Sequence, residues 1–397
     1  MNASNNHAPS GAVGTLQRNI NNKMNIPFRR VALFCDSLVP SGVGRVMDTL
    51  ALHLHQQGFG VFIVCDPGAG ADELWERTQA HRCDGVRLRL RTPDDHQARA
   101  QLQAKLREWK IEVFHSHNGI AWEGHEGILS AREAGVPLVV ATEHLPAWKE
   151  WGDFLPWKRD ALRGVDRLFA VSSSVRDSFV SLGVVEPARI EAVDNGVEEE
   201  EQNKEEARRA VRCELGLPQG APLLLFCGRL VEQKDPYALF DSFALLPLLE
   251  AHLLVVGDGP LWEHCQSRAR ENDLQGRVHF LGNRSDMARL RAASDVFVLP
   301  SKFEGLPLAV LEAMAARLPV VACDVIGTRD CVRHKGTGFL APRADVVALA
   351  KGMQRALSEE GQAWAMAGRA LFCERFTGDA MAMGQLEAYA RAWTVRE

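Results

Sequence analysis

The chain has 397 residues, of which 46% are hydrophobic and 24% charged, enough apolar material for two domains that each bury a core. Its net charge of -5, from 46 basic and 51 acidic residues, argues against a nucleic-acid binder, which normally carries a basic face. The nine cysteines form no C-x-x-C pair, so the sequence favours neither a structural zinc site nor a disulfide framework and is typical of a reducing, cytoplasmic compartment.

The N-terminal stretch, residues 1–27, is polar and rich in Asn, Gly and Ser. It contains no apolar segment of the kind that secretory signals need, so we expect a disordered tail. No apolar run further along reaches the roughly 18 residues of a membrane-spanning helix. The sequence therefore predicts a protein without a membrane span.

Residues 28–197 alternate short apolar runs with longer amphipathic stretches. Strands are predicted at 30–36, 61–65, 111–115, 137–141 and 168–172, and a helix at 46–57. Such alternation is typical of parallel βαβ units. We expect a first Rossmann-like domain here.

A charge-dense stretch, EEEEQNKEEARR at 198–209, then interrupts the pattern, and residues 198–218 are predicted to be a linker that leads into a helix. The alternation resumes over 219–375. Strands are predicted at 223–227, 253–256, 278–281, 296–299 and 320–322, and helices at 236–249, 308–317 and 345–357. The final segment, 376–397, is predicted as a helix that either stays with the second domain or crosses back to the first. The expected fold class is α/β, with two doubly wound domains facing across a cleft.

Polar residues follow several predicted strands of the first half, where open parallel sheets bind their ligands. Gly42 stands in a turn at the start of a predicted helix. Such a turn either binds a phosphate at the helix N-terminus or is a plain tight turn. His117 follows the third strand, and Thr142, Glu143 and His144 follow the fourth. His117 fits either a ligand contact or a structural histidine.

The second half carries the cations and turns that suit an anionic ligand. Arg229 and Lys234 share one strand-helix loop, where a planar guanidinium and a point charge can hold phosphate oxygens. Gly257 lies in the turn Gly-Asp-Gly-Pro after the next strand. Both loops follow predicted strands, so we expect them at the same edge of the second sheet.

The segment Glu304-Gly305-Leu306-Pro307 precedes the helix that begins at Leu308, and Glu312 falls in the second turn of that helix. Proline suits the first turn of a helix, and glycine permits a ligand to approach the backbone. The helix N-terminus can therefore hold a phosphate while Glu304 reaches a neighbouring hydroxyl. The alternative for Glu304 is a carboxylate that only stabilises the helix N-terminus.

These motifs resemble those of the retaining glycosyltransferases of family 4, which have the GT-B fold. The resemblance covers about residues 30–375 and is strongest over 223–342. It rests on the ordered segments GRLVEQKDPYALFDSF, VVGDGPL, RVHFLG, SDVFVLPSKFEGLPLAVLEAMAARLPVVA and GTGFL, with the E-x7-E pair of Glu304 and Glu312 inside the fourth.

The resemblance implies a role for each site residue. Arg229 and Lys234 would hold the diphosphate of a nucleotide-sugar donor, together with the helix N-terminus before Leu308. Glu304 would contact the transferred sugar, and Glu312 the ribose. The remaining donor-side positions are Gly42, Gly257, Gly305 and Leu306, with Leu281, Gly282 and Asn283 around the base.

The resemblance also implies that the first domain, residues 28–197, is on the acceptor side of the molecule, and this domain supplies the other implied positions. His117 matches the family's histidine near the transferred sugar, and Ser172 and Asn195–Gly196 fit its closing segments. Two features depart from the family pattern: Ser-Gly replaces Gly-Gly at 41–42, and the acidic stretch replaces the usual short linker.

The implied reaction is transfer of a sugar, with retention, from a UDP- or GDP-sugar to a hydroxyl of a glycan or lipid-linked acceptor. No metal or further cofactor is predicted, because no D-x-D motif is present. The Trp-rich segment 144–160 fits an acceptor loop, an aromatic sugar platform, a peripheral contact with the cytoplasmic membrane face, or simple packing on the first domain. Nothing in the sequence indicates an oligomeric state.

Three alternatives remain open at this stage. A UDP-sugar 2-epimerase on the same fold would need carboxylates in the first domain, and Glu143 is the candidate. A nucleotide-sugar-binding protein without catalysis would keep the Arg229, Lys234 and Glu304 set. A Rossmann dehydrogenase would need G-x-G-x-x-G with an acidic residue about 20 positions on. Asp66 suits that distance, but the glycine motif is incomplete.

Overall fold

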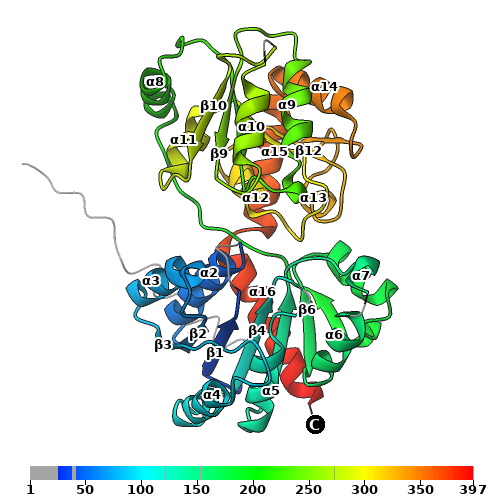
Figure 1. Ribbon diagram of the computed structural model, residues 1–397. Coiled ribbons are helices and arrows are strands. Elements are labelled where there is room, and N and C mark those ends of the chain that lie inside the picture. The colour runs from blue at the N-terminus through cyan, green and yellow to red at the C-terminus, as the bar shows by residue number, and fades with distance from the viewer. Residues whose placement is uncertain (1–25, 38–41, 121, 153, 272, 397) are drawn as a thin grey trace, which may run out of the picture.

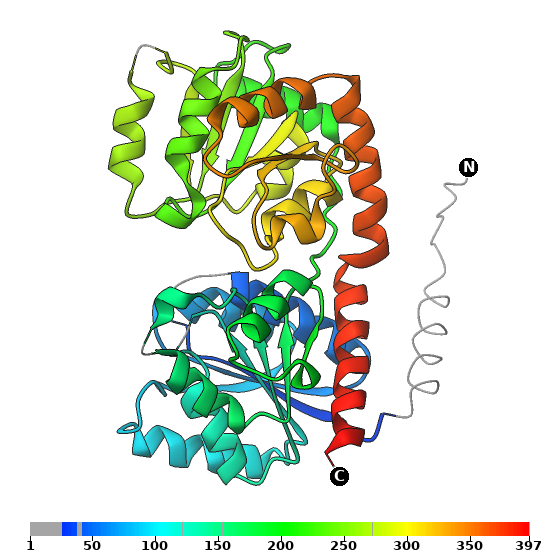
Figure 2. The ribbon, with the colours of Figure 1, turned by 90° about the vertical axis from the view of Figure 1, so that its right-hand side faces the viewer.

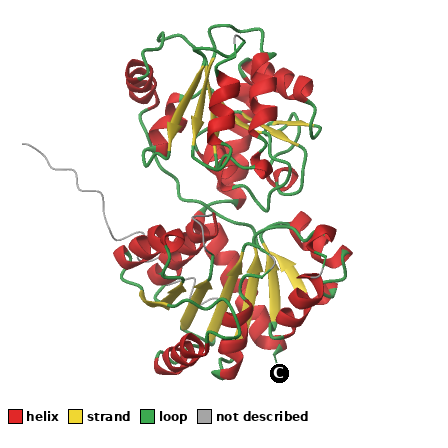
Figure 3. Ribbon diagram, viewed as in Figure 1, coloured by secondary structure: helices red, strands yellow, loops and turns green. Residues whose placement is uncertain are grey.

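The computed structural model describes residues 26–37, 42–120, 122–152, 154–271 and 273–396. The predicted disordered tail lies, up to residue 25, outside these ranges, and so does Ser41. The chain forms two α/β lobes, one above the other, each built on its own parallel sheet (Figure 1). Helices flank both sheets, as the secondary-structure colouring in Figure 3 makes clear. The predicted fold class is confirmed.

The first sheet has seven parallel strands in the order β3-β2-β1-β4-β5-β6-β7. Its strands are β1 (Arg30–Cys35), β2 (Gly60–Cys65), β3 (Asp84–Arg87), β4 (Val113–Asn118), β5 (Leu138–Glu143), β6 (Arg167–Ala170) and β7 (Ile190–Ala192). Alternate residues of β1 enter different cores: Val31 and Leu33 pack on one face, Ala32 and Phe34 on the other. Both faces are therefore covered, as the continuous apolar runs predict.

The helices of the first lobe divide between these two faces. They are α2 (Gly42–Gln56), α3 (Asp72–Ala80), α4 (His96–Glu108), α5 (His125–Glu133), α6 (Phe154–Arg163) and α7 (Ser173–Ser181). Apolar residues of α2 and α3 share a core with Val31 and Leu33, and those of α4 to α7 share one with Ala32 and Phe34. α2 begins at Gly42, four residues before the predicted start at 46.

The second sheet has six parallel strands in the order β10-β9-β8-β11-β12-β13. They are β8 (Leu223–Cys227), β9 (His252–Val256), β10 (Val278–Gly282), β11 (Val296–Leu299), β12 (Val320–Cys323) and β13 (Phe339–Ala341). The helices around it are α9 (Pro236–Ala244), α10 (Trp262–Ala269), α11 (Met287–Ala293), α12 (Leu308–Ala315), α13 (Thr328–Cys331), α14 (Val346–Ala356) and α15 (Glu359–Arg375). Sequence periodicity missed β7 and β13, which have three residues each.

Two further helices lie outside the alternating pattern. α8 (Lys204–Glu214) occupies part of the segment predicted as linker and packs against α11. Its Arg212 is fully buried and donates to the carbonyl oxygens of Ala221 and Ala293 and to the carboxylate of Asp295. This paired cation ties α8 to the second sheet.

α16 (Gly378–Val395) returns along the first lobe. Figure 2 shows it continuing downward from α15 along one side of the molecule. Met381, Leu386 and Tyr389 enter the core shared by α2 and β1, and the Tyr389 hydroxyl lies 2.6 Å from Nδ1 of His115. The C-terminal helix therefore packs on the first sheet. None of the helices within the described ranges is long and apolar enough to cross a membrane.

Candidate functional site

The loop before α12 lies directly against the first lobe. The Ser172 hydroxyl donates to the Gly305 carbonyl oxygen at 3.0 Å, and Asn195 Nδ2 lies 3.5 Å from the Leu306 carbonyl oxygen. A Cβ atom placed on Gly305 would stand only 1.8 Å from the His144 carbonyl oxygen, so only glycine allows this approach. The backbone beside Glu304 thus meets the ends of the first sheet's strands.

Lys234 and Glu304, two of the predicted donor residues, form an ion pair at this boundary. The Lys234 Nζ atom lies 2.6 Å from Glu304 Oε1, and the Glu304 side chain is 6% exposed. Arg229, from the same loop as Lys234, is exposed and has no carboxylate partner among the described residues. Lys234 is therefore held beside the Glu304 carboxylate, whereas Arg229, five residues earlier in the chain, faces solvent.

Gly257 brings the ends of β8 and β9 together. Its φ of +123° lies in the region that favours glycine, and an added Cβ would stand 2.2 Å from the Gly228 carbonyl oxygen. Leu281 is half-buried and Asn283 exposed at the end of β10. In the part of the chain that the structure describes, no ion pair or side-chain hydrogen bond joins these two to Glu304 or Glu312. The predicted base-framing stretch and the carboxylate pair are therefore not linked by a direct polar contact of these side chains.

Three buried histidines lie at the ends of β4 and β5. The rings of His115 and His117 have centroids 4.0 Å apart, and His117 Nδ1 lies 3.1 Å from His144 Nε2. Burial lowers the pKa of His144 to about 3 and holds the pKa of His117 well below 6.5, with neighbouring histidines adding to the latter shift. Nε2 of His117 is buried without a hydrogen-bond partner. A neutral imidazole with one unused nitrogen can donate to or accept from a ligand hydroxyl.

The first turns of α2 and α12 also meet. A Cβ on Gly42 would lie 3.4 Å from Cδ1 of Leu308, the first residue of α12. Arg45, in the first turn of α2, lies 2.8 Å from Glu312 Oε1, and Arg291 on α11 lies 2.9 Å from Glu312 Oε2. Both cations were missed from the sequence, although Arg45 closes the Gly-x-Gly-Arg run that contains Gly42.

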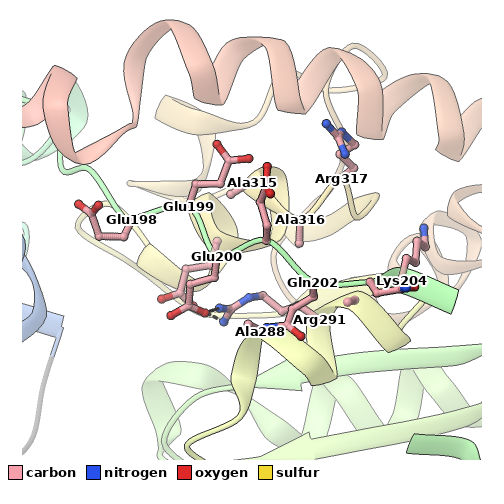
Figure 4. Close-up of a pocket in the computed structure, with 14 residues that line it drawn as sticks. Glu198, Glu199, Glu200, Gln202, Lys204, Ala288, Arg291, Ala315, Ala316 and Arg317 are labelled. Atoms are coloured by element: carbon pink, nitrogen blue, oxygen red, sulfur yellow. Dashed lines mark hydrogen bonds and ion pairs between the residues drawn. The ribbon is translucent and has the colours of Figure 1, made fainter. Parts of the chain in front are cut away.

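A pocket of about 530 Å³ opens beside Glu312, between residues 198–204 and the helices α11 and α12. Figure 4 shows the Arg291 side chain, from α11, pointing toward Glu200, with Ala315, Ala316 and Arg317 along the opposite wall. Arg291 Nη2 lies 2.9 Å from Glu200 Oε2. Arg229 and Lys234 do not line this pocket, so it adjoins the predicted donor site without containing its phosphate cations.

Glu143, the carboxylate of the epimerase alternative, is buried and already paired within the first lobe. Its Oε1 atom lies 2.8 Å from Lys158 Nζ, with both side chains nearly fully buried, and it accepts a 2.8 Å hydrogen bond from Asn118 Nδ2. A carboxylate that balances a buried ammonium is poorly suited to exchange protons with a substrate. Lys158 was not anticipated as its partner.

A second buried acid, Asp36, ends β1 and was also missed. It accepts hydrogen bonds of 3.0 and 3.1 Å from the Gly124 backbone N–H. Burial, followed by the charge of Glu123, raises the pKa of Asp36 to about 7. Glu123 in turn accepts from the backbone N–H groups of Gly119 and Ile120. These groups belong to the first lobe alone.

The Trp-rich segment divides between packing and exposure. Trp148 meets Phe303 of the second lobe with ring centroids 4.2 Å apart, and Trp157 stacks on His125 at 4.2 Å. Phe154 and the neighbouring Trp122 are about half exposed and contact each other. The segment therefore contributes both to the interdomain boundary and to the surface.

Comparison with known families identifies both halves of the chain. Residues 40–201 match the model described as Glycosyltransferase Family 4, and residues 221–359 match Glycosyl transferases group 1. A D-inositol 3-phosphate glycosyltransferase of Streptomyces scabiei is 31% identical over 74% of this chain and 70% of its own length. The chain belongs to glycosyltransferase family 4. It is a glycosyltransferase that uses a nucleotide-sugar donor.

Other family 4 relatives differ in the donors and acceptors that they are named for. A UDP-Gal:alpha-D-GlcNAc-diphosphoundecaprenol alpha-1,3-galactosyltransferase of Escherichia coli is 27% identical, covering 81% of this chain and 86% of its own. A GDP-mannose-dependent alpha-mannosyltransferase of Mycobacterium tuberculosis is 28% identical, covering 86% and 91%. Donor base and acceptor thus vary within this range of similarity.

Solved structures agree with the fold of this family 4 chain. Anabaena HepE, in complex with UDP and glucose, superposes with a TM-score of 0.80 over 92% of this chain and 100% of its own, at 17% identity. WaaG, a glycosyltransferase involved in lipopolysaccharide biosynthesis, gives a TM-score of 0.67 over 92% and 99%, at 18% identity.

Proposed function

We propose that this glycosyltransferase transfers a sugar with retention of anomeric configuration, without a metal ion, from a UDP- or GDP-sugar to a hydroxyl of a glycan or lipid-linked acceptor. The observation that carries the proposal is the 2.6 Å contact between Lys234 and Glu304. The diphosphate and the sugar of such a donor share one bond. A cation for the phosphate beside a carboxylate for the sugar hydroxyls is therefore the pair that this substrate requires.

Charge stabilisation is the main catalytic task in this reaction. When the bond between the anomeric carbon and the phosphate oxygen breaks, its electron pair stays on the phosphate and the sugar becomes oxocarbenium-like. Lys234, Arg229 and the N-terminus of α12 would stabilise the departing charge, with Gly257, Gly305 and Leu306 shaping the backbone around it. Fixed cations of this kind act in place of a divalent ion.

Retention follows if the acceptor attacks from the side that the phosphate leaves. The acceptor oxygen bonds to the anomeric carbon, and its proton passes to the departing phosphate oxygen. Glu304 would hold sugar hydroxyls rather than attack carbon, because its Lys234 partner keeps it on the phosphate side. The unpartnered Nε2 of His117 would orient the transferred sugar from the first lobe.

The donor's nucleoside would lie between Glu312 and the end of β10. Glu312 is the candidate for the ribose hydroxyls, and Leu281 with Asn283 for the base. The UDP complexes of HepE and the UDP-Gal and GDP-mannose named for the relatives support these two nucleotides as the first to test.

We also propose a cytoplasmic location with peripheral membrane contact. All nine cysteines are free thiols, which is typical of a reducing compartment. The half-exposed Trp122 and Phe154 offer an aromatic surface suited to an interface. Sedimentation with anionic vesicles tests the contact: wild-type protein pellets with them, while Trp122→Ser/Phe154→Ser stays in solution.

The deciding experiment is a thermal-shift screen against UDP-, GDP-, ADP- and dTDP-sugars, followed by a transfer assay. A donor at 100 times its Kd adds about 2.7 kcal/mol to the unfolding free energy. We expect a shift with a UDP- or GDP-sugar that Lys234→Ala abolishes. Lys302→Ala is the matched control, because the Lys302 backbone N–H donates to the carbonyl oxygen of Gln233, next to Lys234, but its ammonium pairs with the exposed Glu232.

Two further readouts test the finer parts. Product anomers read by NMR must match the donor's configuration, and turnover must persist in excess EDTA. An inverted product would overturn retention, and loss of turnover that Mg²⁺ restores would overturn metal independence. Conversion of the donor sugar without any acceptor would favour the epimerase instead.

A further inference from the structure

Arg45 and Glu312 form an ion pair between the two lobes. Arg45 is in the first turn of α2, which packs on the first sheet, and Glu312 is in the second turn of α12, which packs on the second. Their closest atoms, Nη2 and Oε1, are 2.8 Å apart. The Glu312 side chain is 6% exposed, whereas that of Arg45 is 42% exposed. The arginine therefore reaches a buried carboxylate from a solvated position.

Glu312 does not depend on Arg45 for its charge balance. Its second oxygen, Oε2, lies 2.9 Å from Arg291, a cation that is itself 6% exposed and belongs to the same lobe. Removing one partner of a buried carboxylate is costly only when no other cation remains. Arg45 can therefore leave Glu312 while Arg291 continues to neutralise it.

The N-terminus of α12 lies within reach of the Arg45 side chain. Gly42, in the same turn of α2, lies against Leu308, the first residue of α12. Leu308 and Glu312 are four residues apart, a rise of about 6 Å along the helix. That distance is within the swing of an arginine side chain. The N-terminus of α12 is the position proposed above for the donor diphosphate.

We propose that Arg45 is a donor-binding residue supplied by the first lobe, which exchanges its contact with Glu312 for the diphosphate when a nucleotide-sugar arrives. The ribose hydroxyls take the place of Arg45 on Glu312, and the guanidinium grips the phosphate oxygens in the bidentate manner that suits its planar fork. This inference rests on the proposed function, because it places the ribose at Glu312 and the phosphates at α12.

The exchange makes interdomain contact sensitive to the donor. Before binding, the pair joins the lobes through a protein carboxylate. After binding, the same arginine joins them through the phosphates, so the lobes stay in contact while the group that Arg45 holds changes from a carboxylate to a diphosphate. Loss of the nucleoside diphosphate would return Arg45 to Glu312.

The test compares a nucleoside with its diphosphate by calorimetry. Uridine with UDP and guanosine with GDP are titrated into the full chain and into Arg45→Ala and Arg45→Lys. We expect Arg45→Ala to weaken diphosphate binding at least about tenfold, as loss of a charged hydrogen bond does, while nucleoside binding is unchanged or tighter. Arg45→Lys should fall between. The control is Arg391→Ala, since Arg391 on α16 is 53% exposed and forms an ion pair with Glu191 of β7.

Each outcome decides the point. Diphosphate affinity that is unchanged or higher in Arg45→Ala would show that Arg45 only competes with the ligand, and would overturn the inference. An equal loss for nucleoside and diphosphate would show a structural effect and overturn it too. If the wild type binds neither UDP nor GDP, the proposed function itself fails before Arg45 is tested. If the wild type binds UDP or GDP and Arg45→Ala binds it as well as the Arg391→Ala control does, the inference about Arg45 fails while the proposed function stands.

Discussion

The Ser172 hydroxyl and the Gly305 carbonyl oxygen are hydrogen-bonded at 3.0 Å across the two lobes. The same glycine lies against the His144 backbone, so the loop carrying Glu304 is fixed relative to the first sheet by contacts on both sides. Donor residues of one lobe and the buried histidines of the other are thereby held at one boundary. The geometry of the reaction depends on this close approach.

Gly305→Ala should separate transfer from nucleoside binding. Its methyl group would meet the His144 carbonyl oxygen at 1.8 Å, a distance that forces the backbones apart. We expect transfer to fall at least about tenfold, since misplacement by about 1 Å can cost two orders of magnitude. Nucleoside affinity measured by calorimetry should fall far less, because Glu312, Leu281 and Asn283, the residues proposed to hold the nucleoside, are all on the second lobe.

The matched control for that variant is Gly220→Ala, where an added Cβ meets nothing within 4 Å. It should keep both wild-type transfer and wild-type melting temperature. Transfer at the wild-type rate in Gly305→Ala would show that the working enzyme does not need this approach.

Lys158→Met should destabilise the first lobe strongly. Lys158 and Glu143 are 1% and 2% exposed and 2.8 Å apart, so the substitution leaves a buried carboxylate without its cation. A loss of about 3–5 kcal/mol in unfolding free energy is expected. Denaturant titration measures it.

The double variant Lys158→Met/Glu143→Gln should recover much of that loss, because no unpaired charge remains. Lys149→Met, at an exposed position of the same Trp-rich segment, serves as the control and should change stability little. A double variant no more stable than Lys158→Met would contradict the charge explanation and point to lost packing.

The sequence could predict elements whose signals are local. The apolar runs of β1 and β8 and the Glu-Gly-Leu-Pro turn before α12 carry their own patterns, so their positions were found within a few residues. β13 was missed because three residues give too few alternations for a periodic signal. The helix expected after the acidic stretch could not be given bounds, because only the buried Arg212 and a few apolar positions mark the packing face of α8.

Contacts between elements far apart in the chain were beyond prediction. His117 and Glu143 were each found after a strand, but their partners His144 and Lys158 depend on how β4, β5 and α6 pack. The pairing of Arg45 with Glu312 depends further on how the two lobes are placed. The spacing of a motif predicts that a residue lies at the end of a strand. It does not predict which residue of the other lobe contacts it.

Asp36→Asn should stabilise the protein above neutral pH. In the unfolded chain this carboxyl ionises near 3.8, whereas burial and Glu123 raise its folded-state pKa to about 7. Between these values the folded state binds more protons, so the unfolding free energy of the wild type falls as pH rises, by up to about 1.4 kcal/mol per pH unit. An asparagine still accepts from Gly124 and carries no charge.

The advantage of Asp36→Asn should therefore be larger at pH 8 than at pH 5. Asp84→Asn, at an exposed position of β3, should show no such difference. Chemical denaturation at the two pH values measures both. An advantage that does not change with pH would mean that Asp36 is ionised in the folded protein throughout.

His144 should make stability fall as the solution becomes acidic. The unfolded chain protonates this histidine near pH 6.5, while burial holds the folded-state pKa at about 3. Between these values the unfolded state binds one more proton, so the wild type loses about 1.4 kcal/mol of unfolding free energy per pH unit as pH is lowered, relative to His144→Gln. Glutamine can still hydrogen-bond His117, which separates the titration from the loss of that contact.

Denaturation of wild type, His144→Gln and the exposed control His55→Gln between pH 7 and pH 5 gives the slope directly. A difference between wild type and His144→Gln that stays constant over this range would show that His144 reaches solvent in the folded protein, contrary to its position between β5 and the Gly305 loop.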